Sequence, residues 1–362
     1  MDNKKTIIIG VFLREQSALS EYFLKMADEL VKLNYHVIVI TDENKTYLVD
    51  KKNNPMVLTW PSYHPNKFQD FIFIKNLIIK YKPKMLISNF TATNLFLIVG
   101  KLYGVPYRIS WIHTVSTALH DIAQWRIWRK KYVFKLATHC IANSNATKLD
   151  AIKTYDIIED KITVIPNLIN KNDLYINKNK DWKITFIGRF HISKGVDVLI
   201  KAMSIVVKEF PTIKLDLIGG GDQTFYIELV RKYSLEKNII FLGELPRDKV
   251  LKSLSKSQFS IVPSIFEAFG YVVIEAFSVK TPVIGSNTGG ILDIIENGKS
   301  GFLFSVGNYN ELASKMILML KDENLRKKCA DYAHDTFINK YELNKNIKET
   351  IDLFHEIIQN ER

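Results

Sequence analysis

The sequence predicts an α/β protein made of two Rossmann-like domains, each a parallel sheet with helices on both faces. Short apolar stretches alternate with amphipathic helical stretches along the whole chain, which is the pattern of repeated βαβ units. The alternation stops in a polar stretch rich in Asn and Lys, residues 167–183, and then starts again. A chain of 362 residues also suits two domains better than a single core.

The first half alternates strands and helices from its N-terminus. We expect strands at 6–12, 36–41, 84–89, 107–113, 139–144 and 162–167. The helices between them should begin near Ser17, Lys67, Thr91, Asp121 and Asn145. The N-terminal domain is therefore predicted to span residues 1–170.

The second half repeats the pattern. We expect strands at 182–190, 213–220, 238–243, 258–264, 281–286 and 301–304, and helix from about Glu323 onward. The second domain is predicted to span 171–345, and residues 346–362 to form a helix that packs back on the first domain. Because open parallel sheets bind ligands beyond the carboxyl ends of their strands, ligand-contacting residues should follow these strands.

The composition fits a globular protein, with 47% hydrophobic and 24% charged residues. The two cysteines, Cys140 and Cys329, form no disulfide framework or metal-type spacing, which favours a reducing compartment. Arg14 and Glu15 follow the first apolar stretch too early for a signal peptide. No stretch reaches the roughly 18 apolar residues of a spanning helix, so we expect a cytoplasmic protein.

Two carboxylates in the second half, Glu267 and Glu275, are separated by seven residues. Glu267 lies in a strand-to-helix loop and Glu275 about one turn into the next helix, so both side chains can face a ligand at the helix start. The N–H groups near Gly270 and Tyr271 favour a phosphate there, and carboxylates suit sugar or ribose hydroxyls. The other interpretation is that Glu267 caps the helix and Glu275 is a solvated surface residue.

Two further loops of the second half follow strands. The loop 188–195 carries Arg189 and Lys194 between Gly188 and a second glycine, and these cations can converge on a diphosphate. The glycine turn at 218–222, with Gly219, allows close approach of a nucleotide, although a tight turn without a ligand explains it equally well.

In this order, the loop 188–195, the glycine turn, the Glu pair and the Gly-rich turn at 285–290 resemble the retaining nucleotide-sugar glycosyltransferases of the GT-B fold, whose hallmark is Glu, seven residues, Glu. The resemblance implies a hexosyltransferase with two domains facing each other across a cleft. We also expect the donor site to be lined by Gly188, Gly219, Phe269, Gly270 and Tyr271. The resemblance further implies that Arg189 and Lys194 hold the donor diphosphate, Glu275 the ribose, and Glu267 the transferred sugar as a catalytic residue.

The first half resembles this family less closely. His113, at a predicted strand end, matches a histidine that in relatives lies beside the donor sugar, so we predict a catalytic role over a purely structural one. Many relatives carry a Gly-Gly loop after the first strand, and this chain does not. Arg14 and Gln16 are our candidates for acceptor contacts in its place. The missing glycines also count against a dinucleotide dehydrogenase.

A metal site is not visible in the sequence. There is no Asp-x-Asp, and no two of the eight histidines are three or four residues apart. We therefore predict transfer without a metal or other cofactor, with the nucleotide sugar as substrate.

The positive charge is concentrated in residues 51–150, which hold 15 Lys and Arg against 3 Asp and Glu and so account for the formal excess of +12. Within this segment, a predicted helix at 120–137 carries an aromatic stripe flanked by cations, as interfacial helices do. The stripe comprises Ile122, Trp125, Trp128, Tyr132 and Leu136, and the cations include Arg126, Arg129, Lys130 and Lys131. We predict docking on an anionic membrane, although the stripe could instead pack on the sheet. No nucleic-acid-binding module is present.

The predicted function is transfer of a sugar, with retention of configuration, from a nucleotide donor to a glycan or lipid-linked acceptor in polysaccharide or glycolipid synthesis at the inner face of the cell membrane. Two alternatives remain open: a GT-B sugar-nucleotide epimerase, and a non-catalytic donor-binding subunit of a glycosyltransferase complex.

Overall fold

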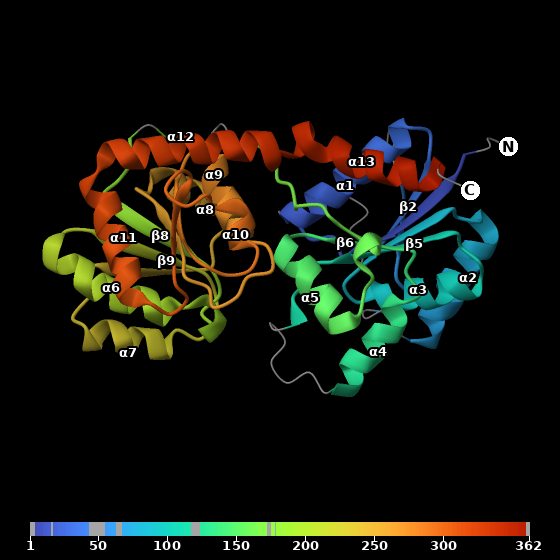
Figure 1. Cartoon of the computed structure of the whole chain (residues 1–362), viewed down its shortest axis with the longest axis horizontal. Coiled ribbons are helices and arrows are strands. Elements are labelled where there is room, and N and C mark those ends of the chain that lie inside the picture. The colour runs from blue at the N-terminus through green and yellow to red at the C-terminus, as the bar shows by residue number, and fades with distance from the viewer. Residues whose placement is uncertain are drawn as a thin grey trace. The chain divides into compact units, whose positions relative to one another are not determined.

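The computed structural model describes residues 4–15, 17–42, 55–62, 67–116, 124–171, 175–177 and 179–359. The chain divides into two compact units (Figure 1). Unit 1 is formed by residues 1–170 together with 343–362, and unit 2 by residues 171–342. The first break coincides with the predicted domain boundary, whereas the returning segment begins at Leu343, earlier than the predicted residue 346.

Unit 1 contains a parallel seven-stranded sheet in the order β3-β2-β1-β4-β5-β6-β7. Its strands are β1 (Thr6–Gly10), β2 (His36–Thr41), β3 (Met56–Thr59), β4 (Met85–Asn89), β5 (Tyr107–Ile112), β6 (His139–Ala142) and β7 (Ile162–Val164). Its helices are α1 (Ala18–Lys32), α2 (Phe68–Tyr81), α3 (Ala92–Leu102), α4 (Gln124–Phe134), α5 (Asn145–Tyr155) and α13 (Leu343–Gln359).

The central strands β1 and β4 of unit 1 are buried on both faces, as expected for a parallel sheet. Ile7 and Ile9 of β1 pack in one cluster with α1 and α13, while Ile8 between them packs in another with α2 and α3. This alternation follows from the two-residue period of a strand, which sends successive side chains to opposite faces.

The C-terminal helix α13 belongs to unit 1. Its buried side chains recur every three or four residues and join the cluster beneath α1; they are Leu343, Ile347, Ile351, Phe354 and Ile358. The hydroxyls of Tyr22 and Thr350 lie 2.6 Å apart in the same interior. The C-terminal helix thus lies on the first sheet, where the sequence pattern places it.

The sequence analysis did not predict the edge strand β3. β3 pairs in parallel with β2 at the sheet edge, and its side chains are exposed or half-buried. An edge strand of four residues has neither the length nor the apolar continuity of the central strands, so the pattern gave no signal.

Unit 2 contains a parallel six-stranded sheet in the order β10-β9-β8-β11-β12-β13. Its strands are β8 (Lys183–Ile187), β9 (Lys214–Ile218), β10 (Ile239–Gly243), β11 (Ser260–Val262), β12 (Val283–Ser286) and β13 (Gly301–Phe304). Its helices are α6 (Val196–Glu209), α7 (Thr224–Lys232), α8 (Arg247–Lys256), α9 (Tyr271–Ser278), α10 (Ile291–Ile294), α11 (Tyr309–Lys321) and α12 (Glu323–Lys340). The predicted α/β class with two Rossmann-like sheets is confirmed.

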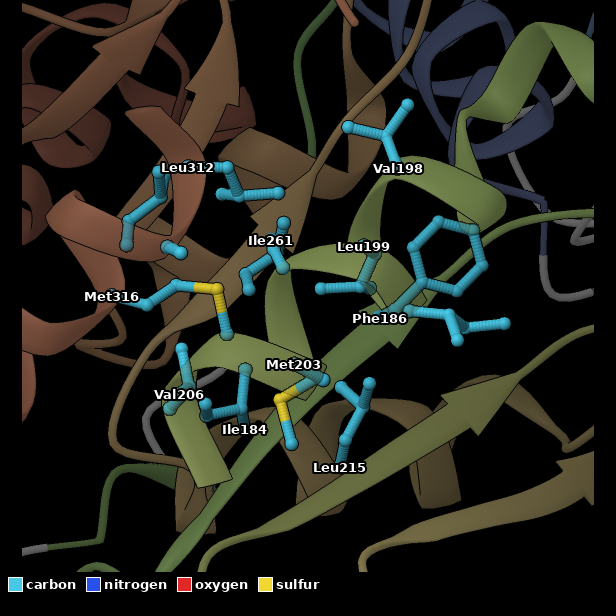
Figure 2. Close-up of a cluster of buried hydrophobic side chains, with 14 of the residues drawn as sticks. Ile184, Phe186, Val198, Leu199, Met203, Val206, Leu215, Ile261, Leu312 and Met316 are labelled. Atoms are coloured by element: carbon cyan, nitrogen blue, oxygen red, sulfur yellow. The ribbon is translucent and has the colours of Figure 1, made fainter. Parts of the chain in front are cut away.

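A hydrophobic cluster fixes the central strands of unit 2. Figure 2 shows Leu199 and Met203 of α6 facing Ile184 of β8, with Leu312 of α11 contributing from the side. Each of these side chains is buried. Burial of a Leu or Ile side chain contributes about 1.5–3 kcal/mol, so this cluster stabilises the packing of α6 and α11 on the sheet.

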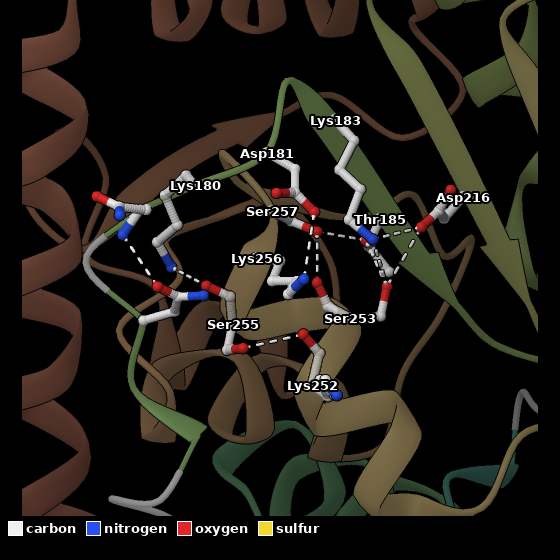
Figure 3. Close-up of polar contacts among 12 residues, drawn as sticks. Lys180, Asp181, Lys183, Thr185, Asp216, Lys252, Ser253, Ser255, Lys256 and Ser257 are labelled. Atoms are coloured by element: carbon white, nitrogen blue, oxygen red, sulfur yellow. Dashed lines mark hydrogen bonds and ion pairs between the residues drawn. The ribbon is translucent and has the colours of Figure 1, made fainter.

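Polar contacts near the amino end of β8 tie down the start of unit 2 (Figure 3). Lys183 Nζ lies 2.6 Å from Asp216 Oδ2, and Lys180 Nζ donates to Ser255 O at 2.7 Å and to Thr281 Oγ1 at 3.0 Å. Burial lowers the pKa of Lys180 to about 8. These groups lie away from the carboxyl edge and serve the fold.

The strand order of unit 2 contains a topological switch point at β8. The chain runs from β8 through β9 to β10 on one side, and then returns to place β11 on the other side of β8. The loops after β8 and β11 leave in opposite directions at such a switch point, and ligands of open α/β sheets bind there. The predicted donor loops are these two.

Candidate functional site

The loop after β8 packs directly on the loop after β11. Gly195 ends the first loop with φ +64°, and a Cβ there would lie 2.0 Å from Pro263 O. The backbone N–H of Ile265 donates to Ser193 O at 2.8 Å. This close backbone contact requires the glycine and brings the two predicted donor loops together.

The closest side-chain contact between these loops joins Lys194 to Glu267. Lys194 Nζ lies 2.6 Å from Glu267 Oε2, and both side chains are half-buried. Ser264 Oγ lies 3.5 Å from the same oxygen. Two predicted site residues, 73 positions apart, are thus neighbours, and the carboxylate charge is balanced by an ammonium.

The glycine pair that follows β12 supports the Glu267 loop. Gly290 N–H donates to Glu267 O at 2.9 Å, and a Cβ on Gly289, which has φ +52°, would lie 1.9 Å from that same oxygen. Gly289 and Gly290 therefore have a packing role: they allow the turn after β12 to approach the backbone of the Glu267 loop closely.

The glycine turn after β9 packs against the start of the β8 loop. A Cβ on Gly219, which has φ +148°, would lie 1.9 Å from Gly188 O, and Phe190 N–H donates to Gly220 O at 2.7 Å. This backbone contact explains the glycine at 219 without a ligand, which was the alternative left open by the sequence.

The remaining predicted donor residues differ in their exposure to solvent. Arg189 is exposed, whereas Phe269 is only 3% exposed and packs against Tyr271 and Tyr341, with ring centroids 5.4 and 6.2 Å away. Gly270 is the N-cap of α9 with φ +111°. The predicted ligand contact of Phe269 therefore cannot come from an accessible ring; its side chain stabilises the start of α9.

Glu275 has a partner that the sequence analysis missed. Its Oε1 lies 3.5 Å from Nε of Arg247, the first residue of α8, and the two side chains are only 14% and 16% exposed. The interpretation of Glu275 as a solvated surface residue is therefore wrong. The sequence did offer one signal for Arg247: it is a cation at the first position of a helix that follows a strand of the same sheet. Spacing along the chain could not show that its partner is Glu275.

In unit 1, His113 lies directly after β5 in an aromatic stack. Its ring centroid lies 5.0 Å from that of Phe90 and 5.9 Å from that of Trp111, both nearly parallel to it. Burial lowers the pKa of His113 to about 3, so the imidazole is neutral at physiological pH. Asn89, at the adjacent end of β4, is fully buried, and its side-chain amide has no hydrogen-bond partner within the described residues.

Two family models match consecutive parts of this chain. Glycosyl transferases group 1 matches residues 170–336, and Glycosyltransferase Family 4 matches residues 19–173. The chain belongs to the GT-B glycosyltransferases. The group 1 match contains both Glu267 and Glu275 together with the loop 188–195.

Similar proteins extend this family assignment. An uncharacterized glycosyltransferase of Methanocaldococcus jannaschii is 28% identical over 230 residues, which are 59% of this chain and 59% of that protein. The capsular polysaccharide biosynthesis glycosyltransferase CapM of Staphylococcus aureus is 26% identical over 295 residues, 74% of this chain and 76% of that protein. The match to the archaeal relative thus spans less than two thirds of that relative's length.

Solved structures support the same fold. HepE of Anabaena, crystallised in complex with UDP and glucose, matches with a TM-score of 0.78 and 18% identity, covering 97% of this chain and 100% of that chain. At this identity the likeness establishes the GT-B fold alone.

In this GT-B family member, the α4 helix presents the predicted aromatic stripe outward. Trp125, Trp128 and Tyr132 are 57%, 62% and 52% exposed, while Val133 is buried in the cluster beneath the helix. Leu136, predicted in the stripe, packs on that inner cluster instead. Ile122 lies outside the described residues.

The predicted cations of α4 divide into two groups. The guanidinium carbons of Arg126 and Arg129 each lie 5.4 Å from the ring centroid of Trp125, on the exposed side. Lys131 instead pairs with Asp156 at 2.8 Å, and burial followed by the charge of Arg129 lowers the pKa of Lys130. The predicted outward cation cluster is therefore wrong in part, because Lys130 and Lys131 contact the end of α5 instead.

The predicted acceptor residues lie after β1. Arg14 is exposed, and its backbone N–H donates to Ser20 Oγ at 2.8 Å; Gln16 lies outside the described residues. Within the described residues, no three His, Cys, Asp or Glu side chains gather closely enough to hold a metal ion. Nor does any helix in that part of the chain have the length and apolar content to cross a bilayer.

Proposed function

We propose that this chain is a retaining glycosyltransferase that moves a sugar from a nucleoside-diphosphate sugar to a glycan or lipid-linked glycan acceptor. The observation that carries the proposal is the Lys194–Glu267 pair at the carboxyl edge of unit 2, beside the N-cap of α9. It joins a cation suited to a phosphate and a carboxylate suited to sugar hydroxyls at the switch point of one sheet.

In this proposal the donor diphosphate binds between Lys194, Arg189 and the N-terminus of α9. A helix N-terminus offers unpaired N–H donors and a positive dipole end to an anion. The complex of Anabaena HepE with UDP and glucose supports a nucleotide-sugar donor for a chain of this fold. Lys194 would then exchange Glu267 for the phosphate when the donor binds.

Once Lys194 contacts the phosphate, the Glu267 carboxylate is available to accept from hydroxyls of the transferred sugar. The acceptor hydroxyl would attack the anomeric carbon from the same face from which the nucleoside diphosphate leaves, which retains the configuration of that carbon. The leaving phosphate would take the proton of the acceptor hydroxyl. Glu267 acts as a binder and electrostatic stabiliser of an oxocarbenium-like state. We also propose a catalytic role for His113 of unit 1, whose imidazole is neutral at physiological pH. The cations and helix terminus supply the charge stabilisation of the leaving group, and we propose that no metal is needed.

We also propose that α4 docks the protein on the inner face of the cell membrane. Trp125, Trp128 and Tyr132 are exposed together, and Arg126 and Arg129 lie around them. Aromatic rings flanked by arginines bind at the interface of anionic bilayers. A membrane position would suit a lipid-linked acceptor, and the similarity to CapM supports a role in cell-surface polysaccharide synthesis.

A donor screen by thermal shift tests the proposal. UDP-, GDP- and ADP-sugars are added to the full chain, to Lys194→Met and to Lys201→Met, a control that removes a helical lysine paired with Asp197 on α6. One donor class should raise the melting temperature of the wild type and of K201M but not of K194M, because a ligand bound only to the folded state stabilises it. No stabilisation by any donor at millimolar concentration would contradict the proposal. Release of nucleoside diphosphate only when acceptor is present would separate transfer from epimerisation.

A further inference from the structure

The end of α4 and the end of α5 border a pocket of about 300 Å³ in unit 1. Most of its wall is apolar, and the side chains of this part are Phe134, Ala137, Cys140, Tyr155, Ile157 and Ile158. We propose that the pocket takes one acyl chain of an anionic membrane lipid, whose headgroup is held by Lys135 and Lys161. This inference rests on the proposed docking of α4 and names the lipid contact that would accompany it.

The wall of the pocket suits a hydrocarbon chain. The ring centroids of Phe134 and Tyr155 lie 5.0 Å apart, and Cys140, in β6, is buried. Burial raises the pKa of the Cys140 thiol to about 12, so the sulfur stays protonated and adds no charge to the wall. An apolar wall with a few polar groups beside it is typical of sites for small ligands.

The charges around the pocket favour an anionic headgroup. Lys135 and Lys161 line the pocket and are exposed. Asp156, the acidic residue of the lining, is already paired, since its Oδ2 lies 2.8 Å from Lys131 Nζ. The charge of Lys161 also acts on the Cys140 thiol, so this ammonium lies close to the apolar wall. The lining therefore carries an excess of positive charge beside an apolar depression.

The pocket is continuous with the exposed aromatic row of α4. The rings of Trp128 and Tyr132 lie 4.5 Å apart, and Lys135 Nζ lies 5.2 Å from the ring centroid of Tyr132. Contacts thus run from the exposed rings to a lysine that lines the pocket. Rings of this kind bind at the level of the lipid headgroups, and lysines beside them reach the anionic groups of the lipid. This continuity favours a membrane lipid over a soluble anion as the occupant.

Protection of Cys140 from alkylation tests the inference directly. The chain has two cysteines, and Cys329 in unit 2 is also buried, so it is an internal reference. The full chain is labelled with iodoacetamide and analysed by mass spectrometry, with decanoate as a soluble single-chain anion. At ten times the Kd of decanoate, about a tenth of the pockets stay open, so labelling of Cys140 should slow about tenfold. Labelling of Cys329 should not change.

Isothermal titration calorimetry measures what the pocket selects. Decanoate should bind at least about tenfold more tightly than decylamine, a cation with the same chain length. Octanoate should bind about fifteenfold more weakly than decanoate, which is about fourfold for each methylene that is no longer buried. Decanoate that binds no more tightly than octanoate would show that the chain stays outside the apolar wall.

Variants of exposed residues separate the headgroup contact from a general loss of structure. The double variant Lys135→Met and Lys161→Met should bring the ratio of decanoate to decylamine affinity close to one. Lys153→Met removes an exposed lysine from the last turn of α5 that does not line the pocket, and it should behave as the wild type. Ile158→Ser, at a residue of the lining that is 61% exposed, should weaken decanoate binding without unfolding the chain.

Vesicles test the source of the acyl chain. Phosphatidylglycerol vesicles should protect Cys140 of the wild type from iodoacetamide, and phosphatidylcholine vesicles should not. The double variant Trp125→Ser and Trp128→Ser should lose protection by vesicles and keep protection by decanoate, because its pocket is unchanged.

Three results would overturn the inference, and they are distinguishable. If the chain binds phosphatidylglycerol vesicles while Cys140 is labelled at its unprotected rate, no lipid chain enters the pocket, although docking by α4 stands. If decanoate slows the labelling of Cys140 and Cys329 equally, its effect is not that of a ligand in this pocket. If the wild type does not bind anionic vesicles at all, the docking proposal fails and the inference fails with it.

Discussion

Lys194 Nζ and Glu267 Oε2 lie 2.6 Å apart, joining the loop after β8 to the loop after β11. These two half-buried, oppositely charged side chains orient each other at the switch point of the unit 2 sheet. A diphosphate that bound Lys194 would compete directly with Glu267 for the ammonium group. Donor binding and the availability of the Glu267 carboxylate are therefore coupled in this arrangement.

Removing either partner should have different kinetic effects. Lys194→Met should weaken donor binding and lower kcat/KM by at least about 100-fold, or roughly 3 kcal/mol, since it removes a charge-assisted phosphate contact and leaves Glu267 unpaired. Glu267→Gln should lower kcat more than it changes the donor KM. Steady-state kinetics with the donor identified by thermal shift measures both. Isolation of a glycosyl group covalently bound to Glu267 would contradict its assignment as a binder.

The glycine pair after β12 offers a stability test. Gly289→Ala should destabilise the folded state by about 2–4 kcal/mol, because a Cβ at φ +52° would lie 1.9 Å from Glu267 O. Gly298→Ala is the matched control: φ is +80° there, but nothing lies within 4 Å, so only about 1 kcal/mol of backbone strain is expected. Urea unfolding gives both free energies. Equal costs would show that the contact with Glu267 is unimportant.

His113 should make the stability of the folded state depend on pH. Its folded-state pKa, about 3, lies below the ordinary value of 6.5, so the unfolded chain binds the proton more readily between these values. This contribution is complete above pH 6.5 and is lost as the pH falls toward 3. Between pH 7 and pH 5 the wild type should lose about 1–2 kcal/mol more than His113→Asn, since the slope cannot exceed about 1.4 kcal/mol per pH unit.

The control for this comparison is Phe225→Ser, which replaces an exposed ring on α7 and removes no titratable group. Its free energy of unfolding should fall with pH as steeply as that of the wild type. If His113→Asn shows the wild-type slope, the imidazole of His113 is not desolvated in the folded protein.

Membrane docking by α4 can be measured with vesicles. The double variant Trp125→Ser and Trp128→Ser should bind phosphatidylglycerol vesicles about tenfold more weakly at low salt, since two exposed rings no longer leave water. Phe225→Ser, which replaces an exposed ring on α7 of unit 2, is the matched control and should bind as the wild type does. Failure of the wild type to sediment with anionic vesicles would refute docking.

Metal dependence is tested by chelation. With Lys194, Arg189 and the N-terminus of α9 stabilising the leaving diphosphate, turnover should persist in millimolar EDTA at close to its full rate. Loss of all turnover, restored by Mg²⁺ or Mn²⁺, would show that a metal supplies that charge instead.

The sequence was sufficient for the architecture and for the loops that carry the candidate site. Buried parallel strands are continuous apolar runs, helix starts are marked by residues such as Ser17 and Ser144, and ligand loops follow strand ends, so local pattern and topology agree. The edge strand β3 was missed because it is short and half-exposed. The stripe predicted on α4 is exposed at Trp125, Trp128 and Tyr132 but not at Leu136, since helical spacing alone does not say how far the inner cluster extends around the helix.

What only the tertiary structure decided was which charges meet. Lys194 and Glu267 could be assigned to the same edge of a sheet from sequence, but their direct pairing depends on the backbone contact between Gly195 and Pro263. The sequence could not show that Arg247 lies beside Glu275, because the distance between these two side chains depends on how α8 packs against α9. Periodicity fixes elements and faces, whereas pairing across loops depends on contacts between residues far apart in the chain, which no local pattern encodes.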